Sequence, residues 1–184
     1  MELITIGLLE FNSIAAGIQA ADVMVKKAPI TLLQVAPVCP GKFIVLIYGD
    51  VSSVDSSLKA GIEEGRETYL VDKLFLPNAH PYLIPAITGT TVIKEIKSLA
   101  VIETFSVASC IVSADAACKE APVELILMRL ACGLGGKAYF TMTGELPDIE
   151  AAYQASLKSI ANDGLLVNGV IIPSPHIELN EKML

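Results

Sequence analysis

The second half of this 184-residue chain repeats the first half, and such an internal repeat constrains the fold more than any other feature. The segment "LEFNSIAAGIQAADVMVKKAPITLL" (9–33) aligns with "IETFSVASCIVSADAACKEAPVELI" (102–126) at an offset of 93 positions, which also places Cys39 on Cys132. After a two-residue insertion, "GKFIVLIYGDVSSVDSSLKAG" aligns with "GKAYFTMTGELPDIEAAYQAS", and "LVDKLFLPNAH" aligns with "LVNGVIIPSPH". The duplication predicts two tandem domains, 1–93 and 94–184.

Each half has the same order of predicted elements. In the first half, an apolar strand is followed by an alanine-rich helix that starts at a serine and ends at an Ala-Pro pair. Two apolar strands joined by a glycine-containing turn, a second helix and a last strand follow. The strands and first helices are predicted at 3–10, 13–27, 30–38 and 43–49, and again at 98–105, 106–120, 123–131 and 138–144. The order β-α-β-β-α-β predicts two ferredoxin-like domains and an α/β (α+β) fold class.

The composition excludes several classes of partner. The chain is 53% hydrophobic and 18% charged, so it can bury a large core. Its formal net charge of −7, its low aromatic content of 5% and its lack of Trp argue against nucleic acid as a partner. No apolar run reaches the roughly 18 residues that a membrane-spanning helix needs, and the N-terminus does not resemble a signal peptide. We therefore expect a cytosolic protein with large subunit interfaces.

No set of residues predicts an enzyme active site. The "GLGGK" segment fails as a phosphate-binding loop, since the motif needs Gly at 131 and Ser or Thr at 138, and both are Ala. His80 and His176 occupy equivalent positions, which indicates a structural role such as a turn or a helix start. The four cysteines include no CxxC pair, so a complete metal site within one chain has little support. Cys110 and Cys118 lie on an alanine-rich predicted helix and are expected in the core.

The repeated motifs carry a family resemblance. They are the acidic residue that ends the first strand, the "A-D-x-x-x-K" helix, the Gly-acid pair before the second helix and the "P-x-x-H" after the last strand. Together they resemble the shell domain of bacterial microcompartments, and their double occurrence resembles the tandem-domain shell proteins. "CPGK" in the first half with "GLGGK" in the second resembles the trimeric shell proteins of propanediol-utilisation compartments.

The resemblance implies a pseudohexameric homotrimer that serves as a structural tile of a microcompartment shell in the bacterial cytoplasm. It implies that the turns between the two middle strands line a central pore. There Cys39 from three subunits would ligate an iron–sulfur cluster of the 4Fe–4S type, for electron transfer or for cluster transport across the shell. The pore-lining residues would be Val38, Pro40, Gly41, Lys42, Gly133, Leu134, Gly135, Gly136 and Lys137. Lys26 and Lys119 would lie at the tile edge against other shell proteins, and encapsulated redox enzymes would be further partners.

The residues alone leave other interpretations open. Cys39 as a small buried side chain is one of them, because free Cys is often only that. A second alternative keeps the tile but gives it an open pore for small metabolites, without a cluster. A third is a soluble ligand-binding or regulatory oligomer built on tandem ferredoxin-like domains. For Cys132, packing or a place at a strand end is the leading interpretation.

Overall fold

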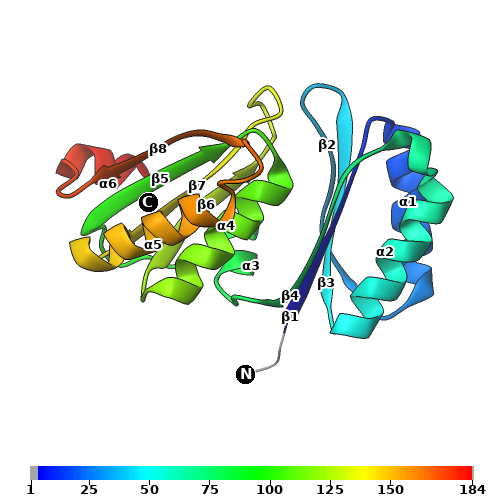
Figure 1. The fold of residues 1–184 in the computed structure, drawn as a ribbon, viewed down its shortest axis with the longest axis horizontal. Helices are drawn as coiled ribbons and strands as arrows, with labels where there is room; N and C mark the ends of the chain where they lie inside the picture. Colours follow the sequence, from blue (N-terminus) through cyan, green and yellow to red (C-terminus); the bar gives the residue numbers. More distant parts are fainter. Residues whose placement is uncertain (1–3, 184) are drawn as a thin grey trace. The chain divides into compact units, whose positions relative to one another are not determined.

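The computed structural model describes residues 4–183. The chain forms two compact units, of which the first ends at Ala79 and the second begins at His80. Each unit is described by itself (Figure 1). The duplication predicts the domain boundary after residue 93, whereas by contacts residues 80–93 belong to the second unit. The short helix α3 (Leu83–Thr88) contacts strand β6 (Glu124–Leu130), and the Thr91 hydroxyl donates a hydrogen bond to the carbonyl oxygen of Ile126 at 2.6 Å.

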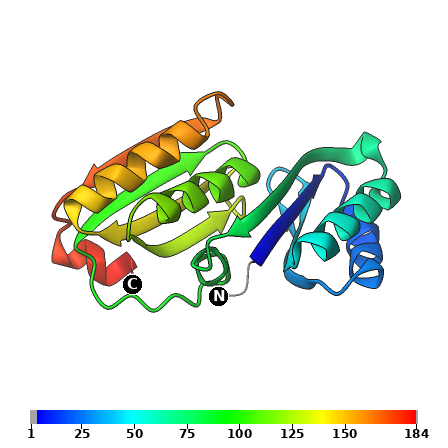
Figure 2. The same ribbon diagram turned by 60° about the horizontal axis from the view of Figure 1, so that its bottom comes forward.

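The first unit is a four-stranded antiparallel sheet covered on one face by two helices (Figures 1 and 2). Its strand order is β2-β3-β1-β4, with every neighbouring pair antiparallel. The elements are β1 (Ile4–Phe11), α1 (Ile14–Lys27), β2 (Thr31–Val38), β3 (Lys42–Gly49), α2 (Val51–Gly65), the 3-10 turn η1 (Glu67–Tyr69) and β4 (Leu70–Ala79). The predicted β-α-β-β-α-β order is confirmed.

The second unit repeats this arrangement with the strand order β6-β7-β5-β8. Its remaining elements are β5 (Ser98–Thr104), α4 (Val107–Glu120), β7 (Ala138–Gly144), α5 (Leu146–Ser159), β8 (Leu166–Ile172) and α6 (Ile177–Met183). The predicted α+β class is confirmed for both halves. The short helices α3 and α6 each follow the last strand of a repeat, where the sequence predicts only a turn or a helix start at the histidine.

The helix starts follow from local capping chemistry. The Ser13 hydroxyl accepts a hydrogen bond from the N–H of Ala16 at 3.3 Å, and Ser106 accepts one from the N–H of Ser109 at 3.0 Å. These bonds satisfy N–H groups that have no partner within the helix. Helices α1 and α4 therefore begin where the two serines predicted.

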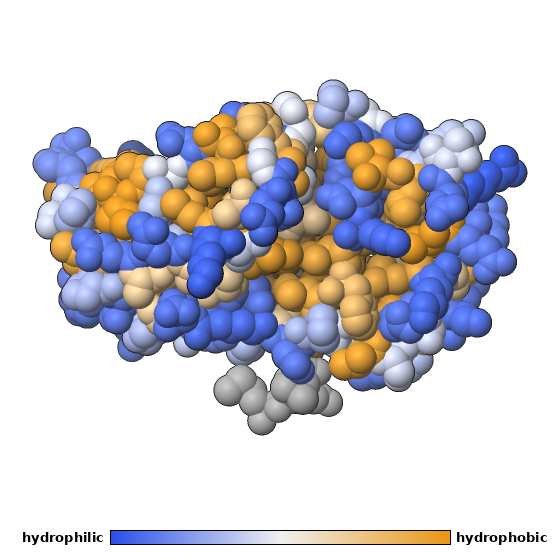
Figure 3. Space-filling model, in the orientation of Figure 1, coloured by the Kyte–Doolittle hydropathy of each residue, from blue (hydrophilic) through white to orange (hydrophobic). Residues whose placement is uncertain are grey.

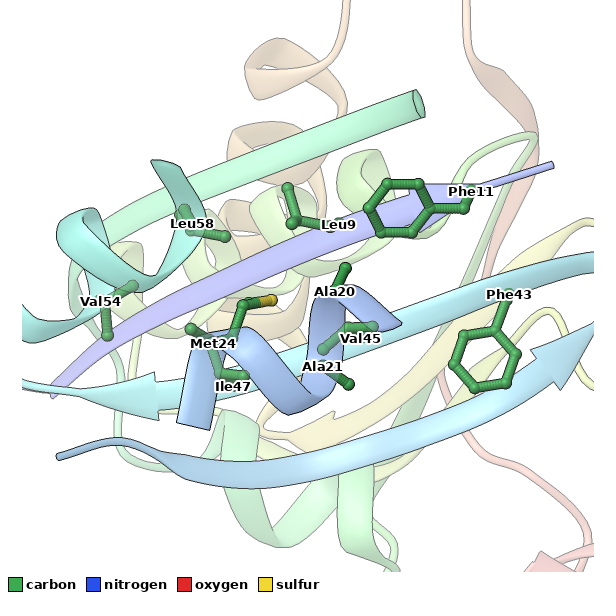
Figure 4. Close-up of a cluster of buried hydrophobic side chains, with 10 residues drawn as sticks. All are labelled: Leu9, Phe11, Ala20, Ala21, Met24, Phe43, Val45, Ile47, Val54 and Leu58. Carbon is green, nitrogen blue, oxygen red and sulfur yellow. The ribbon is translucent and has the colours of Figure 1, made fainter. Parts of the chain in front are cut away.

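The core of the first unit lies between its helices and its sheet. Figure 4 shows Ala20, Ala21 and Met24 of α1 facing side chains that come from β1, β3 and α2. Small residues on α1 allow the helix to lie close to the sheet. The buried cluster consists of Leu9, Phe11, Ala20, Ala21, Met24, Phe43, Val45, Ile47, Val54 and Leu58.

The two helices of the second unit are also joined by polar contacts. The Ser156 hydroxyl of α5 donates to the carbonyl oxygen of Ser113 on α4 at 3.0 Å, and the Ser113 hydroxyl donates in return to the carbonyl oxygen of Ser156 at 3.3 Å. Both serines are fully buried, so each hydroxyl needs such a partner. Within residues 4–183, no helix combines the length and the apolar character that crossing a membrane requires.

Candidate functional site

The turn between β2 and β3 is short and open. Val38 pairs with Lys42 across the hairpin, so Cys39, Pro40 and Gly41 form the connection. Gly41 has φ +81°, a left-handed conformation that glycine adopts without steric cost, and no heavy atom lies within 4 Å of where its Cβ would be. The Cys39–Pro40 peptide is cis. Pro40 and Gly41 are exposed and Cys39 is half-buried, whereas Val38 is buried in the single chain.

The equivalent turn between β6 and β7 is longer and richer in glycine. Leu130 pairs with Ala138 at its base. Gly133, Gly135 and Gly136 all have positive φ, and a Cβ on Gly133 or Gly135 would meet no heavy atom within 4 Å. The N–H of Lys137 donates to the carbonyl oxygen of Leu134 at 3.2 Å, which closes the turn. This turn presents mostly backbone to its surroundings.

A lysine–glutamate ion pair lies at the base of each turn. Lys42 Nζ lies 2.7 Å from Glu10 Oε1, and Lys137 pairs with Glu103 in the same way. The Glu10 side chain is only 4% exposed, whereas that of Glu103 is 33% exposed. The sequence analysis missed these pairs, although both glutamates and both lysines stand at repeated positions. Each lysine is neutralised locally, so neither turn carries a free lysine charge.

The four thiols fall into two groups. Cys110 and Cys118 are buried on α4, as expected. Burial raises the pKa of both thiols, that of Cys118 to about 12 with the nearby Asp115 carboxylate adding to the effect. A raised pKa favours the protonated thiol, which is typical of buried structural cysteines. Cys39 and Cys132 lie on the two turns, half-buried and exposed respectively.

One copy of the chain does not contain a metal site of its own in its described part. Within residues 4–183, no three or more His, Cys, Asp or Glu side chains come close enough together to hold a metal ion. Cys39 is thus a single potential ligand on an open turn. Several copies would have to contribute to any metal site built on it.

The two candidate tile-edge lysines lie near the ends of equivalent helices. Lys26 on α1 pairs with Asp22 at 2.5 Å, and Lys119 on α4 pairs with Asp115 at 2.5 Å. The Lys26 side chain is 70% exposed, and that of Lys119 is 43% exposed. Both lysines are accessible in the single chain.

The two histidines start short helices, as their repeated position predicted. The carbonyl oxygen of His80 accepts a hydrogen bond from the N–H of Leu83 at 3.1 Å, and that of His176 accepts one from the N–H of Leu179 at 2.9 Å. Each imidazole Nδ1 also accepts from the amide two residues later. Burial lowers the pKa of His80. His176 directly precedes α6, whereas His80 stands before the turn that leads into α3.

Comparison with known proteins extends these observations. The BMC domain matches residues 5–79 and again 98–175. The chain is 38% identical over 179 residues to the bacterial microcompartment shell protein PduT of Citrobacter freundii, covering 97% of each protein. It is 42% identical over 60 residues to the carboxysome shell protein CcmK2 of Synechocystis sp., covering 33% of this chain and 58% of that protein.

Solved structures agree. A crystal structure of a microcompartment protein from Desulfitobacterium hafniense DCB is 47% identical and has a TM-score of 0.93, covering 97% of this chain and 98% of its own. The fused, permuted hexameric shell protein of the RMM microcompartment has a TM-score of 0.62 over 86% of this chain and 84% of its own. At 17% identity, that second likeness concerns the fold alone.

Proposed function

The chain belongs to the BMC domain family of bacterial microcompartment shell proteins, and from that premise we propose that three copies form a pseudohexagonal tile with an iron–sulfur cluster in its central pore. The family membership confirms the resemblance seen in the sequence. Two BMC domains per chain support the trimer, because three chains then fill the six places of a hexagonal tile around one axis. Other shell proteins in the same microcompartment, within the bacterial cytoplasm, are the partners at its edges.

The observation that carries the cluster proposal is the placement of the thiols. Cys39 stands on the open three-residue turn of a hairpin, whereas Cys110 and Cys118 are buried with raised pKa values. One Cys39 from each of three copies supplies three thiolates around the axis, a ligand set that suits an iron–sulfur cluster. The open space around Gly41 leaves room beside the thiol.

The residues around Cys39 have separable roles in this proposal. Pro40 restricts the backbone next to the ligand, and Gly41 permits the sharp turn that brings three thiols together. The buried ion pair between Lys42 and Glu10 fixes the base of the hairpin. When bound, the cluster supplies one-electron chemistry, and three protein ligands leave one iron open to water or a small molecule. The tile would thus pass electrons across the shell, or carry the cluster through it.

Anaerobic purification tests the proposal. The wild-type protein, Cys39→Ser and Cys132→Ser are compared by visible absorption and by iron and sulfide assays. We expect a brown wild-type protein with about four iron and four sulfide per three chains, since a 4Fe–4S cluster would be shared by one tile. The colour and the iron are lost in Cys39→Ser and kept in Cys132→Ser, which is the matched control on the equivalent turn.

A colourless wild-type trimer would contradict the cluster and favour a tile with an open pore. The glycines of the second turn support that second function. Gly133 and Gly135 have open space where a side chain would stand, so they leave backbone N–H groups accessible, and such groups favour small anionic metabolites. In that case Cys39 lines the passage or packs within it.

A further inference from the structure

The equivalent aspartates of the two repeats have different surroundings. Asp115 on α4 has a 7% exposed side chain, and its carboxylate accepts a hydrogen bond from the backbone N–H of His80 at 2.8 Å. Asp22 stands at the same position on α1, but its side chain is 56% exposed and Lys26 is its partner. The structure therefore shows what covers this position in one repeat and leaves the same position open in the other.

The apolar residues near these two aspartates differ in exposure in the same way: they are covered in the second repeat and exposed in the first. Cys118 lies beside His80 and Tyr82, and Leu125 lies beside Tyr82 and Pro85, so residues 80–93 cover this face of the second repeat. Within residues 4–79, the equivalent residues of the first repeat are exposed. Val25 stands in place of Cys118 and is 40% exposed, and Leu32 stands in place of Leu125 and is 41% exposed, against 2% for Leu125. We call Asp22, Val25 and Leu32 the open face.

Other large apolar side chains of the first repeat are exposed as well. Figure 3 shows apolar side chains in several patches among hydrophilic ones. Large exposed apolar groups in the first repeat include Ile14, Ile18, Val25, Leu32 and Val35. Val25 and Leu32 belong to this exposed set, and exposed apolar patches are typical of interaction sites.

The segment that would cover the open face is present at the other end of the second repeat. Residues 176–183 follow β8 as residues 80–93 follow β4. Both segments begin with a histidine that accepts the same two backbone hydrogen bonds. Leu83 is fully buried in the first of these segments, whereas the equivalent Leu179 is 40% exposed. Within the described part of one chain, the open face and the Leu179 side chain of residues 176–183 are thus both exposed.

We propose that residues 176–183 of one copy cover the open face of a second copy, with the backbone N–H of His176 donating to the carboxylate of Asp22. This inference rests on the proposed trimer and identifies the contact that closes it. The contact joins two different surfaces, so it is head-to-tail and repeats around the ring until the ring closes. Helix α6 is the element that one copy offers to the next.

The test uses two substitutions that break opposite halves of the contact. Leu32→Glu places a charge on the open face, and Leu179→Glu places one on the covering segment. Each should convert the trimer to monomer in native mass spectrometry and light scattering, because burying an unpaired charge is strongly unfavourable. Val51→Glu is the matched control, an exposed aliphatic residue at the start of α2, and it should stay trimeric. Circular dichroism checks that every variant is folded.

Mixing the two broken variants makes the test specific. The Leu32→Glu chain keeps an intact covering segment, and the Leu179→Glu chain keeps an intact open face. An equimolar mixture should therefore form a one-to-one heterodimer, held by the single contact that neither substitution has touched. The milder Asp22→Ala should weaken trimer association about tenfold per contact, as expected for a lost hydrogen bond to a charged group.

The outcomes separate this inference from the proposed function. Trimers that persist in both glutamate variants would overturn the contact and leave the trimeric tile standing. A mixture that yields no heterodimer would also overturn it. A monomeric wild-type protein would overturn the tile and the contact together.

Discussion

The two domains fill equivalent positions of their cores with side chains of different sizes. In the first, Phe43 of β3 lies against Gly17 of α1, so closely that a Cβ on Gly17 would come within 2.4 Å of the ring. At the equivalent positions the second domain has Ala138 and Cys110, both fully buried. The same exchange recurs elsewhere in the two cores, where Phe11 with Gly65 becomes Thr104 with Ile160, and Met24 with Gly61 becomes Ala117 with Ser156.

In each pair, a large side chain that lies against a glycine in the first domain is replaced by two side chains of more equal size in the second. Cores tolerate substitution when total volume is kept, and they lose stability when one side of a contact changes alone. Each repeat has therefore acquired its own set of complementary pairs. A residue from one domain will not fit the other unless its partner is moved with it.

The largest expected effect comes from breaking one such pair. Phe43→Ala should lower the free energy of unfolding by about 3 to 5 kcal/mol, because it leaves a cavity over Gly17. Adding Gly17→Cys recreates the pair of the second domain and should recover part of the loss. Urea denaturation at a fixed protein concentration measures both changes.

Gly17→Cys by itself supplies the control for that cycle. It should destabilise the protein by about 1 to 3 kcal/mol through overpacking against Phe43. If the double variant lost as much stability as the two single variants added together, the positions would not be coupled. The sizes of the side chains at positions 17 and 43 would then not depend on each other.

The ion pairs beneath the two turns give the second comparison. Lys42→Met leaves the Glu10 carboxylate, which is 4% exposed, without a partner, and should cost about 3 kcal/mol of unfolding free energy. Lys137→Met frees the more exposed Glu103 and should cost about 1 kcal/mol or less. Parallel denaturation of the two variants measures the difference. Equal losses would mean that burial of the glutamate does not set the cost.

The smallest effect concerns the starts of α2 and α5. Hydrogen bonds from the side chain and N–H of Ser53, and then from Ser52, lower the pKa of Asp50 well below its ordinary value of 3.8. A lowered pKa in the folded state stabilises the protein above the ordinary value, and that contribution is lost as pH falls below it. Asp50→Ala should therefore lower the unfolding midpoint slightly at neutral pH and have less effect in strong acid.

Glu145 is the matched residue at the start of α5, where its side chain makes no capping hydrogen bond. The effect of Glu145→Ala on the unfolding midpoint should not shrink in the same way between neutral and strongly acidic solution. Thermal unfolding across the acid range measures both variants. An Asp50→Ala effect that stayed constant with pH would contradict the capping role.

Local patterns predicted most of the fold, and tertiary packing accounts for what they missed. Ser13 and Ser106 marked the helix starts because capping depends on the few residues nearby, and the Cys39 and Gly133–Gly136 turns were found between strand patterns for the same reason. The extent of helix α3 was not predicted, because this short helix packs on β6 and its own sequence carries no helical pattern. The pairing of Lys42 with Glu10 joins residues far apart in the chain, and only their repetition pointed to it.

The covalent link between the two domains has a consequence for which turns are present in an assembled ring. If the two kinds of turn were made as separate single-domain proteins, six places around an axis would be filled by chance, and strictly alternating rings would be one arrangement among many. One chain that carries both turns fixes their ratio at translation. In the proposed ring of three copies, every Cys39 turn would be flanked by glycine-rich turns, so the number of axial thiols would not vary with the expression level of any gene.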